Sequence, residues 1–171
     1  MKSAIIYSTI TGNTKKVAEG ILEVMPKGTE IFNVEENPKW EEYDLLILGY
    51  WVDRGLADTK MRDYMNKIQG KNLGVFGTLG ERDNTDHSMG IQKAVEEEIS
   101  KSNRVLANFI CQGKIDSKFI TKWLEILDKN PNDEKARDIV EEFNKASVHP
   151  NEEDIKNAQV VFKNMLDSIG I

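Results

Sequence analysis

Short apolar segments alternate along this chain with longer segments whose apolar residues recur every three to four positions. The short segments predict strands at about residues 3–7, 29–34, 44–50, 73–78 and 104–112. The longer segments predict helices at about residues 15–25, 59–69, 88–101 and 151–168. The segment 44–50 is apolar almost throughout, which is typical of a parallel strand buried on both faces. Strands that alternate with helices predict an α/β fold with a parallel sheet and right-handed crossovers.

A hydroxyl-rich loop joins the first predicted strand to the first predicted helix. It consists of Ser8, Thr9, Ile10, Thr11, Gly12, Asn13 and Thr14. A helix N-terminus carries unpaired N–H groups and a positive partial charge, so this loop is a candidate phosphate site. The loop contains no Lys or Arg, and neutral hydrogen bonds would therefore hold the phosphate. The alternative is an ordinary Ser- and Thr-rich turn that caps the helix.

This stretch resembles the phosphate loop of the flavodoxins. Their signature asks for apolar, aromatic, hydroxyl and small residues at set distances, and the sequence meets every position of it. The matching residues are Ile5, Ile6, Tyr7, Thr9, Gly12, Thr14, Ala18 and Ile21. The resemblance implies that the phosphate belongs to FMN. It also implies a flavodoxin-like three-layer fold with a five-stranded parallel sheet of order 2-1-3-4-5.

In sheets of this kind, ligands bind at the carboxyl ends of the strands, so the loops after the first, third and fourth strands are expected to form the site. The loop after the third strand contains two aromatic residues, which suit a flat ring. Its candidate residues are Tyr50, Trp51, Val52, Asp53, Arg54 and Gly55. Core packing is the alternative for the two aromatic side chains, and an exposed surface position is the alternative for Arg54.

Val52 departs from the pattern of the family, in which this loop often reads Trp-Gly-Asp and the Trp covers one face of the isoalloxazine ring. The resemblance implies that the peptide after the Trp turns its carbonyl toward flavin N5, and that Gly permits the positive φ of that conformation. A β-branched Val resists this conformation, which leaves the stabilisation of one-electron-reduced flavin open. Gly55 is the alternative residue for that role if the register differs.

The loop after the fourth strand contributes Thr78, Leu79 and Gly80, which suit a close approach of the backbone to the pyrimidine edge of a flavin. No aromatic residue follows in this loop, although the family often has one there. One face of the ring is therefore expected to be covered by an aliphatic side chain or to be open to a partner.

Residues 114–150 exceed what a five-stranded unit needs. Residues 117–127 predict an amphipathic helix, and residues 134–145 predict a highly charged one. We interpret the segment as a helical insertion before the last helix, within a single domain of residues 1–171. The apolar face of its first helix is expected to pack on the sheet layer or on a partner.

Composition narrows the function classes. The chain of 171 residues has a net charge of −6, which argues against nucleic-acid and anionic-membrane partners. Cys111 is the single cysteine, so no internal disulfide forms, and no apolar run reaches the length of a membrane span. A cytoplasmic location and a monomer or homodimer are the expectations.

His87, His149 and Cys111 have no metal-ligand spacing, and a buried structural role is the main interpretation of the cysteine.

Three function classes follow. The leading hypothesis is an FMN-binding electron carrier that passes electrons between a reductase and an acceptor protein, its redox partners. The alternative is an FMN-dependent NAD(P)H oxidoreductase that acts on a small quinone-like acceptor. The third is a flavin-free scaffold that uses the insertion as an interaction surface.

Overall fold

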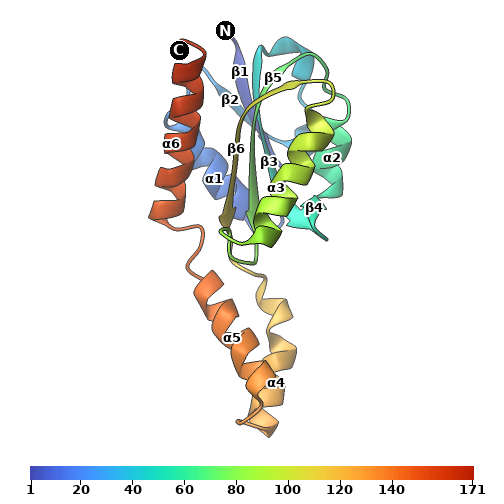
Figure 1. The fold of residues 1–171 in the computed structure, drawn as a ribbon, viewed down its shortest axis with the longest axis vertical. Coiled ribbons are helices and arrows are strands. Elements are labelled where there is room, and N and C mark those ends of the chain that lie inside the picture. The colour runs from blue at the N-terminus through green and yellow to red at the C-terminus, as the bar shows by residue number, and fades with distance from the viewer.

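The computed structural model describes residues 1–171 and has helices on both faces of a parallel sheet (Figure 1). The parallel strands are β1 (Ser3–Tyr7), β2 (Glu30–Asn33), β3 (Leu45–Asp53), β5 (Asn72–Leu79) and β6 (Arg104–Gln112). Their order is β2-β1-β3-β5-β6, and the short strand β4 (Leu56–Ala57) pairs with β3 in an antiparallel hairpin. If β4 is left out of the numbering, this is the predicted order 2-1-3-4-5, which is confirmed.

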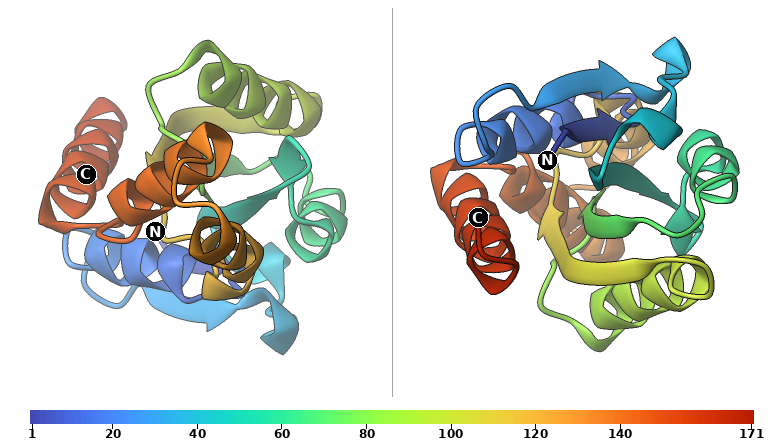
Figure 2. Two further views of the ribbon diagram at one scale, coloured as in Figure 1. Left: turned by 90° about the horizontal axis from the view of Figure 1, so that it is seen from below. Right: turned by 90° about the horizontal axis from the view of Figure 1, so that it is seen from above.

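Two helices cover each face of the sheet (Figure 2). On one face lie α1 (Asn13–Leu22) and α6 (Glu152–Ser168), and on the other lie α2 (Thr59–Met65) and α3 (Asp86–Ile99). Successive residues of a strand point to opposite faces, so Ile47 packs on the α1–α6 side and Leu48 on the α2–α3 side. This explains why the third strand is apolar throughout.

Two glycines allow aromatic rings to lie against the backbone of the neighbouring strand. Gly49 is paired with Phe76, and at the next register position Tyr50 is paired with Gly77. A Cβ atom on Gly49 would lie 2.1 Å from the Phe76 ring, and one on Gly77 would lie 2.6 Å from the Tyr50 ring. Each ring therefore occupies the space above its partner glycine, one on each face of the sheet.

The boundaries of several helices differ from those that the periodicity predicts. The α2 helix ends at Met65 rather than at residue 69, because the N–H groups of Lys67 and Ile68 bond to carbonyls three residues back and close tight turns. Helix α1 begins two residues before the predicted start. Two further 3₁₀ turns, Val34–Glu36 and Trp40–Glu42, lie in the connection between β2 and β3.

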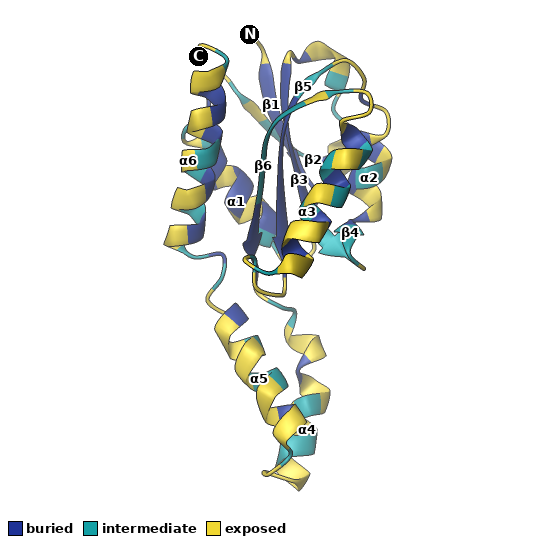
Figure 3. Cartoon of the chain, in the orientation of Figure 1, coloured by how far each residue is buried: buried dark blue, intermediate teal, exposed yellow.

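The insertion forms a helical hairpin that projects from the carboxyl end of the sheet (Figure 1). It consists of the 3₁₀ turn η3 (Ser117–Phe119), α4 (Thr121–Lys129) and α5 (Glu134–Ala146). Of the two expectations for its apolar face, packing on the sheet layer is wrong, because α4 packs against α5 instead, and packing on a partner stays a prediction. Ile120, Ala136 and Ala146 are buried, whereas most other residues of the hairpin are exposed (Figure 3).

Gly77→Ala is expected to destabilise the fold, because its Cβ would overlap the buried Tyr50 ring. Overpacking of this kind costs about 1–3 kcal/mol of the free energy of unfolding. Gly90→Ala is the control, since Gly90 lies within α3 with open space around it, and we expect a gain of about 0.5–1 kcal/mol there. Urea denaturation of both variants measures the difference, and equal stabilities would contradict the packing argument.

Candidate cofactor-binding site

A cavity of about 450 Å³ opens at the carboxyl end of the sheet, where three predicted loops meet. It is lined by Ile10, Thr11, Asn13, Trp51, Val52, Asp53, Thr78, Leu79, Gly80, Lys114, Ile115, Asp116 and Phe119. The first nine of these residues belong to the predicted site, and the last four come from the segment after β6. The rule that ligands bind beyond the carboxyl ends of parallel strands therefore locates the cavity.

The N-terminus of α1 has free hydrogen-bonding capacity at this cavity. Gly12 is its N-cap residue, with φ of 89°, and no side chain caps the helix. The hydroxyl of Thr9 accepts a hydrogen bond from the Gly12 N–H at 3.0 Å, which closes the loop before the helix begins. Side chains cap helices α2, α3, α5 and α6, and α4 continues a turn capped by Asp116. The first turn of α1 is thus suited to an anion.

Two residues of the phosphate loop bind other loops rather than line the cavity. The hydroxyl of Thr14 is fully buried and forms a 2.9 Å hydrogen bond with the Thr78 hydroxyl. The buried Ser8 hydroxyl donates a 2.8 Å hydrogen bond to Asp58 Oδ1. These contacts join the first loop to the end of β5 and to the N-terminus of α2, and they hold the backbone that faces the cavity.

Trp51 and Tyr50 occupy different environments. Trp51 lines the cavity, whereas Tyr50 is fully buried in the core on the α2–α3 side. The sequence-based placement of Tyr50 in the site is therefore corrected: side chains alternate along a strand, and its ring fills the space over Gly77. Burial raises the pKa of the Tyr50 hydroxyl, and this hydroxyl has no hydrogen-bond partner.

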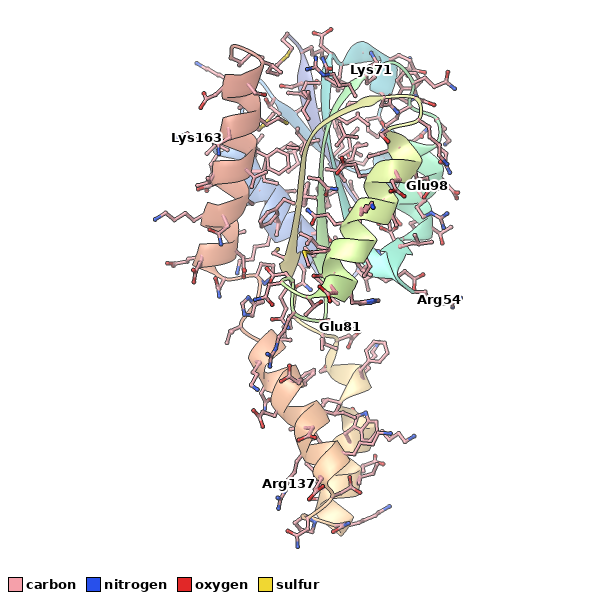
Figure 4. The ribbon with its side chains drawn as sticks, viewed as in Figure 1. Arg54, Lys71, Glu81, Glu98, Arg137 and Lys163 are labelled. Carbon is pink, nitrogen blue, oxygen red and sulfur yellow. The ribbon has the colours of Figure 1, made fainter.

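Arg54 and Gly55 form the two-residue turn of the β3–β4 hairpin. Their φ angles are 51° and 81°, as a turn with two residues of positive φ requires. The Arg54 side chain is 93% exposed and lies at the edge of the molecule (Figure 4), so neither residue lines the cavity. Val52 stays extended, opposite Ala57, and the Trp51 carbonyl accepts a 3.0 Å hydrogen bond from the Asp58 N–H.

Lys114, Ile115, Asp116 and Phe119 are the cavity residues that the sequence analysis does not predict. Their segment is held between two of the predicted loops: the Gly113 N–H donates to the Leu79 carbonyl at 2.7 Å, and Asn13 Nδ2 donates to the Lys114 carbonyl at 2.8 Å. The strand arrangement could have pointed to this segment, because β6 ends at the same edge of the sheet as β1, β3 and β5. Cys111 precedes this segment, and burial raises the pKa of its thiol.

A second cavity of about 210 Å³ adjoins the first and shares Ile10, Trp51 and Asp53 with it. Asp58 lines this cavity, is 2% exposed, and has one carboxylate oxygen, Oδ2, without a hydrogen-bond partner. Burial raises the pKa of the Asp58 carboxyl, although hydrogen bonds from Ser8 and from backbone N–H groups oppose this effect. The same carboxylate caps α2 through the Met61 N–H.

The larger cavity combines features that fit a ligand with a phosphate and a flat ring. The first turn of α1, Thr11 and Asn13 supply hydrogen-bond donors, and Trp51 supplies an aromatic surface. No cluster of three or more His, Cys, Asp and Glu side chains is placed to hold a metal ion. No helix has the length and apolarity that crossing a membrane requires.

Comparison with known families agrees with this geometry. The profile described as a flavodoxin domain matches residues 4–163. The chain belongs to the flavodoxin family. It is also 35% identical, over 170 residues and 97% of each chain, to the flavodoxin-like domain-containing protein BilS of Clostridioides difficile (strain CD3).

Solved structures show the same flavodoxin fold. An archaeal flavodoxin superposes over 100% of both chains with a TM-score of 0.65 and 13% identity. A flavoprotein from Lactobacillus acidophilus NCFM, solved in complex with FMN, superposes with a TM-score of 0.50 and 18% identity. That match covers 72% of this chain and 98% of the other. At these identities, the likeness concerns the fold.

Asp58→Asn is expected to change how stability depends on pH. Because burial raises the carboxyl pKa above its usual value of 3.8, the folded state binds this proton more tightly than the unfolded state. The contribution of Asp58 to the free energy of unfolding therefore falls as pH rises from about 4 through the folded-state pKa. Asn keeps an oxygen acceptor for Ser8 and Met61 but cannot ionise. The free energy of unfolding of the variant should therefore rise relative to that of the wild type as pH increases over that range.

Urea denaturation between about pH 4 and 8 measures this difference. Asp58→Ala is the control, because it loses the helix cap at every pH, at a cost of about 0.5–2 kcal/mol. Parallel pH profiles of the wild type and Asp58→Asn would show that the carboxyl is not perturbed by burial.

Proposed function

We propose that this flavodoxin-family chain binds FMN and serves as an electron carrier between a reductase and an acceptor protein. The observation that carries the proposal is that an uncapped helix N-terminus and Trp51 face one cavity at the carboxyl edge of the sheet. A phosphate and an aromatic ring on one ligand satisfy both features. The FMN bound to the flavoprotein from Lactobacillus acidophilus NCFM, which shares the fold, supports the choice of ligand.

Each part of the cavity has a role in this proposal. The first turn of α1, with Thr11 and Asn13, would hold the phosphate by hydrogen bonds, and Trp51 would stack on the ring. Leu79 and Gly80 would offer backbone groups to the polar edge of the ring. The bound flavin supplies the redox chemistry, while these residues fix its position and limit its contact with water.

The alternative is an FMN-dependent NAD(P)H oxidoreductase that acts on a small quinone-like acceptor. The smaller cavity supports it, because that cavity adjoins the proposed flavin site through Ile10, Trp51 and Asp53. A small acceptor bound there would contact Trp51, which lines both cavities. The redox partners of either function would meet an acidic protein of net charge −6.

Titration of the purified protein with FMN, followed by anaerobic reduction, tests the proposal. We expect the flavin absorption spectrum to shift on binding and reduction to proceed in resolvable one-electron steps. Rapid bleaching on mixing with NADH or NADPH alone would favour the oxidoreductase. Absence of FMN binding would overturn both functions.

Trp51→Ala is expected to increase the fluorescence of bound FMN, because a stacked indole quenches flavin emission. The affinity for FMN should also fall, by about tenfold, since base–aromatic stacking contributes about 1–3 kcal/mol. The control is Trp40→Ala, which removes an indole that packs near Lys71, away from the cavity. An unchanged emission of FMN bound to the Trp51 variant would place Trp51 outside the stacking position.

A further inference from the structure

We propose that Phe119, at the base of the helical hairpin, binds the flavin in the larger cavity together with Trp51, which reaches that cavity from the end of β3. The inference rests on the FMN binding proposed above. It adds to the flavin site a second aromatic residue, which the loop after β5 does not contain. Phe119 is the only aromatic residue besides Trp51 that lines the larger cavity.

The position of Phe119 relative to the sheet supports this role. Trp51 lies at the end of β3 and Phe119 follows β6, and β5 lies between these two strands. Trp51 therefore reaches the cavity from the sheet, whereas Phe119 reaches it from the segment that crosses from β6 to Asn13 of α1. The end of β5 and the residue after it contribute only Thr78, Leu79 and Gly80 to the lining, so they offer no aromatic surface.

Phe119 has apolar surface that a ligand in the cavity can cover. The side chain is 72% exposed although it lines a cavity. Contact with an aromatic ring in the cavity would remove part of this apolar surface from water, which is favourable. Leu124, one turn further along the hairpin, is 49% exposed but does not line the cavity, so exposure alone does not distinguish the two residues.

The segment that carries Phe119 is fixed to both neighbouring loops. The Gly113 N–H donates to the Leu79 carbonyl, and the Lys114 carbonyl accepts from the side-chain amide of Asn13. A Cβ atom on Gly80 would lie 2.9 Å from Ile115 Cγ1, so the segment packs closely against the loop after β5.

The turn itself is also held in place. Asp116 Oδ1 accepts a 2.9 Å hydrogen bond from the Lys118 N–H, which caps η3. Ile120 is buried, so it anchors the residue next to Phe119. Further along, Arg82 forms a two-point contact with Glu142 of α5, at 2.8 and 3.3 Å, which ties the hairpin to the loop after β5. Phe119 is thus presented to the cavity by an ordered turn rather than by a free loop.

The test compares Phe119→Ala with Leu124→Ala in the full-length protein. FMN affinity is measured by fluorescence titration, and access to the bound flavin is measured by acrylamide quenching. We expect Phe119→Ala to weaken FMN binding about fivefold or more and to raise the quenching constant, because one stacking surface is lost. Leu124→Ala should match the wild type in both measurements. Phe119→Trp should restore the affinity and lower the emission of the bound flavin.

The outcomes separate this inference from the function on which it rests. If the wild type binds FMN and Phe119→Ala has the same affinity and quenching constant, the inference fails and the proposed function stands. Equal losses in Phe119→Ala and Leu124→Ala would mean that the hairpin acts through its folding, which also overturns a contact role for Phe119. If the wild type binds no FMN, the proposed function itself fails.

Discussion

The close packing of aromatic rings on glycines determines how β3 and β5 end. Gly49 and Phe76, and then Tyr50 and Gly77, face each other at successive register positions, with one ring on each face of the sheet. The next pair in this register is Trp51 and Thr78. Because side chains alternate along a strand, burial of Tyr50 on the α2–α3 side leaves Trp51 free to line the cavity, and it brings Thr78 to the first loop. The packing of the core therefore also determines the shape of the site.

Two buried hydrogen bonds then hold the first loop from both sides. Ser8 bonds to Asp58, and Thr14 bonds to Thr78, so the hydroxyl groups at the two ends of the loop are used within the protein. The N-terminus of α1 between them has no side-chain cap, in contrast to α2, where the carboxylate of Asp58 is the cap. A fixed loop with unpaired N–H groups binds an anion without paying the entropy of ordering the backbone at that moment.

The sequence predicts the parallel sheet and the three loops at its carboxyl edge, because these depend on periodicity and on general rules of α/β topology, whereas the strand order comes from the resemblance to the flavodoxins. It does not place individual side chains: Tyr50 faces the core because alternation and the space over Gly77 decide its direction. The β3–β4 hairpin is missed because Arg54-Gly55 lacks the Asn, Asp or Gly that usually precedes Gly in such turns. Phe119 is missed because its contact with the cavity depends on where the segment after β6 crosses the sheet edge, which local patterns do not encode.

The hairpin and the cavity lie at the same end of the molecule, and one continuous segment of the chain lines the cavity and leads into the hairpin. The segment from Gly113 to Phe119 leaves β6 and passes between Asn13, at the start of α1, and Leu79, at the end of β5. It then begins a hairpin whose two helices pack chiefly on each other. Figure 4 shows Glu81, in the loop after β5, near the point where the hairpin leaves the sheet. A protein that approaches the mouth of the cavity therefore meets this hairpin together with the loops of the sheet, so the same residues that complete the cavity also shape the surface around it.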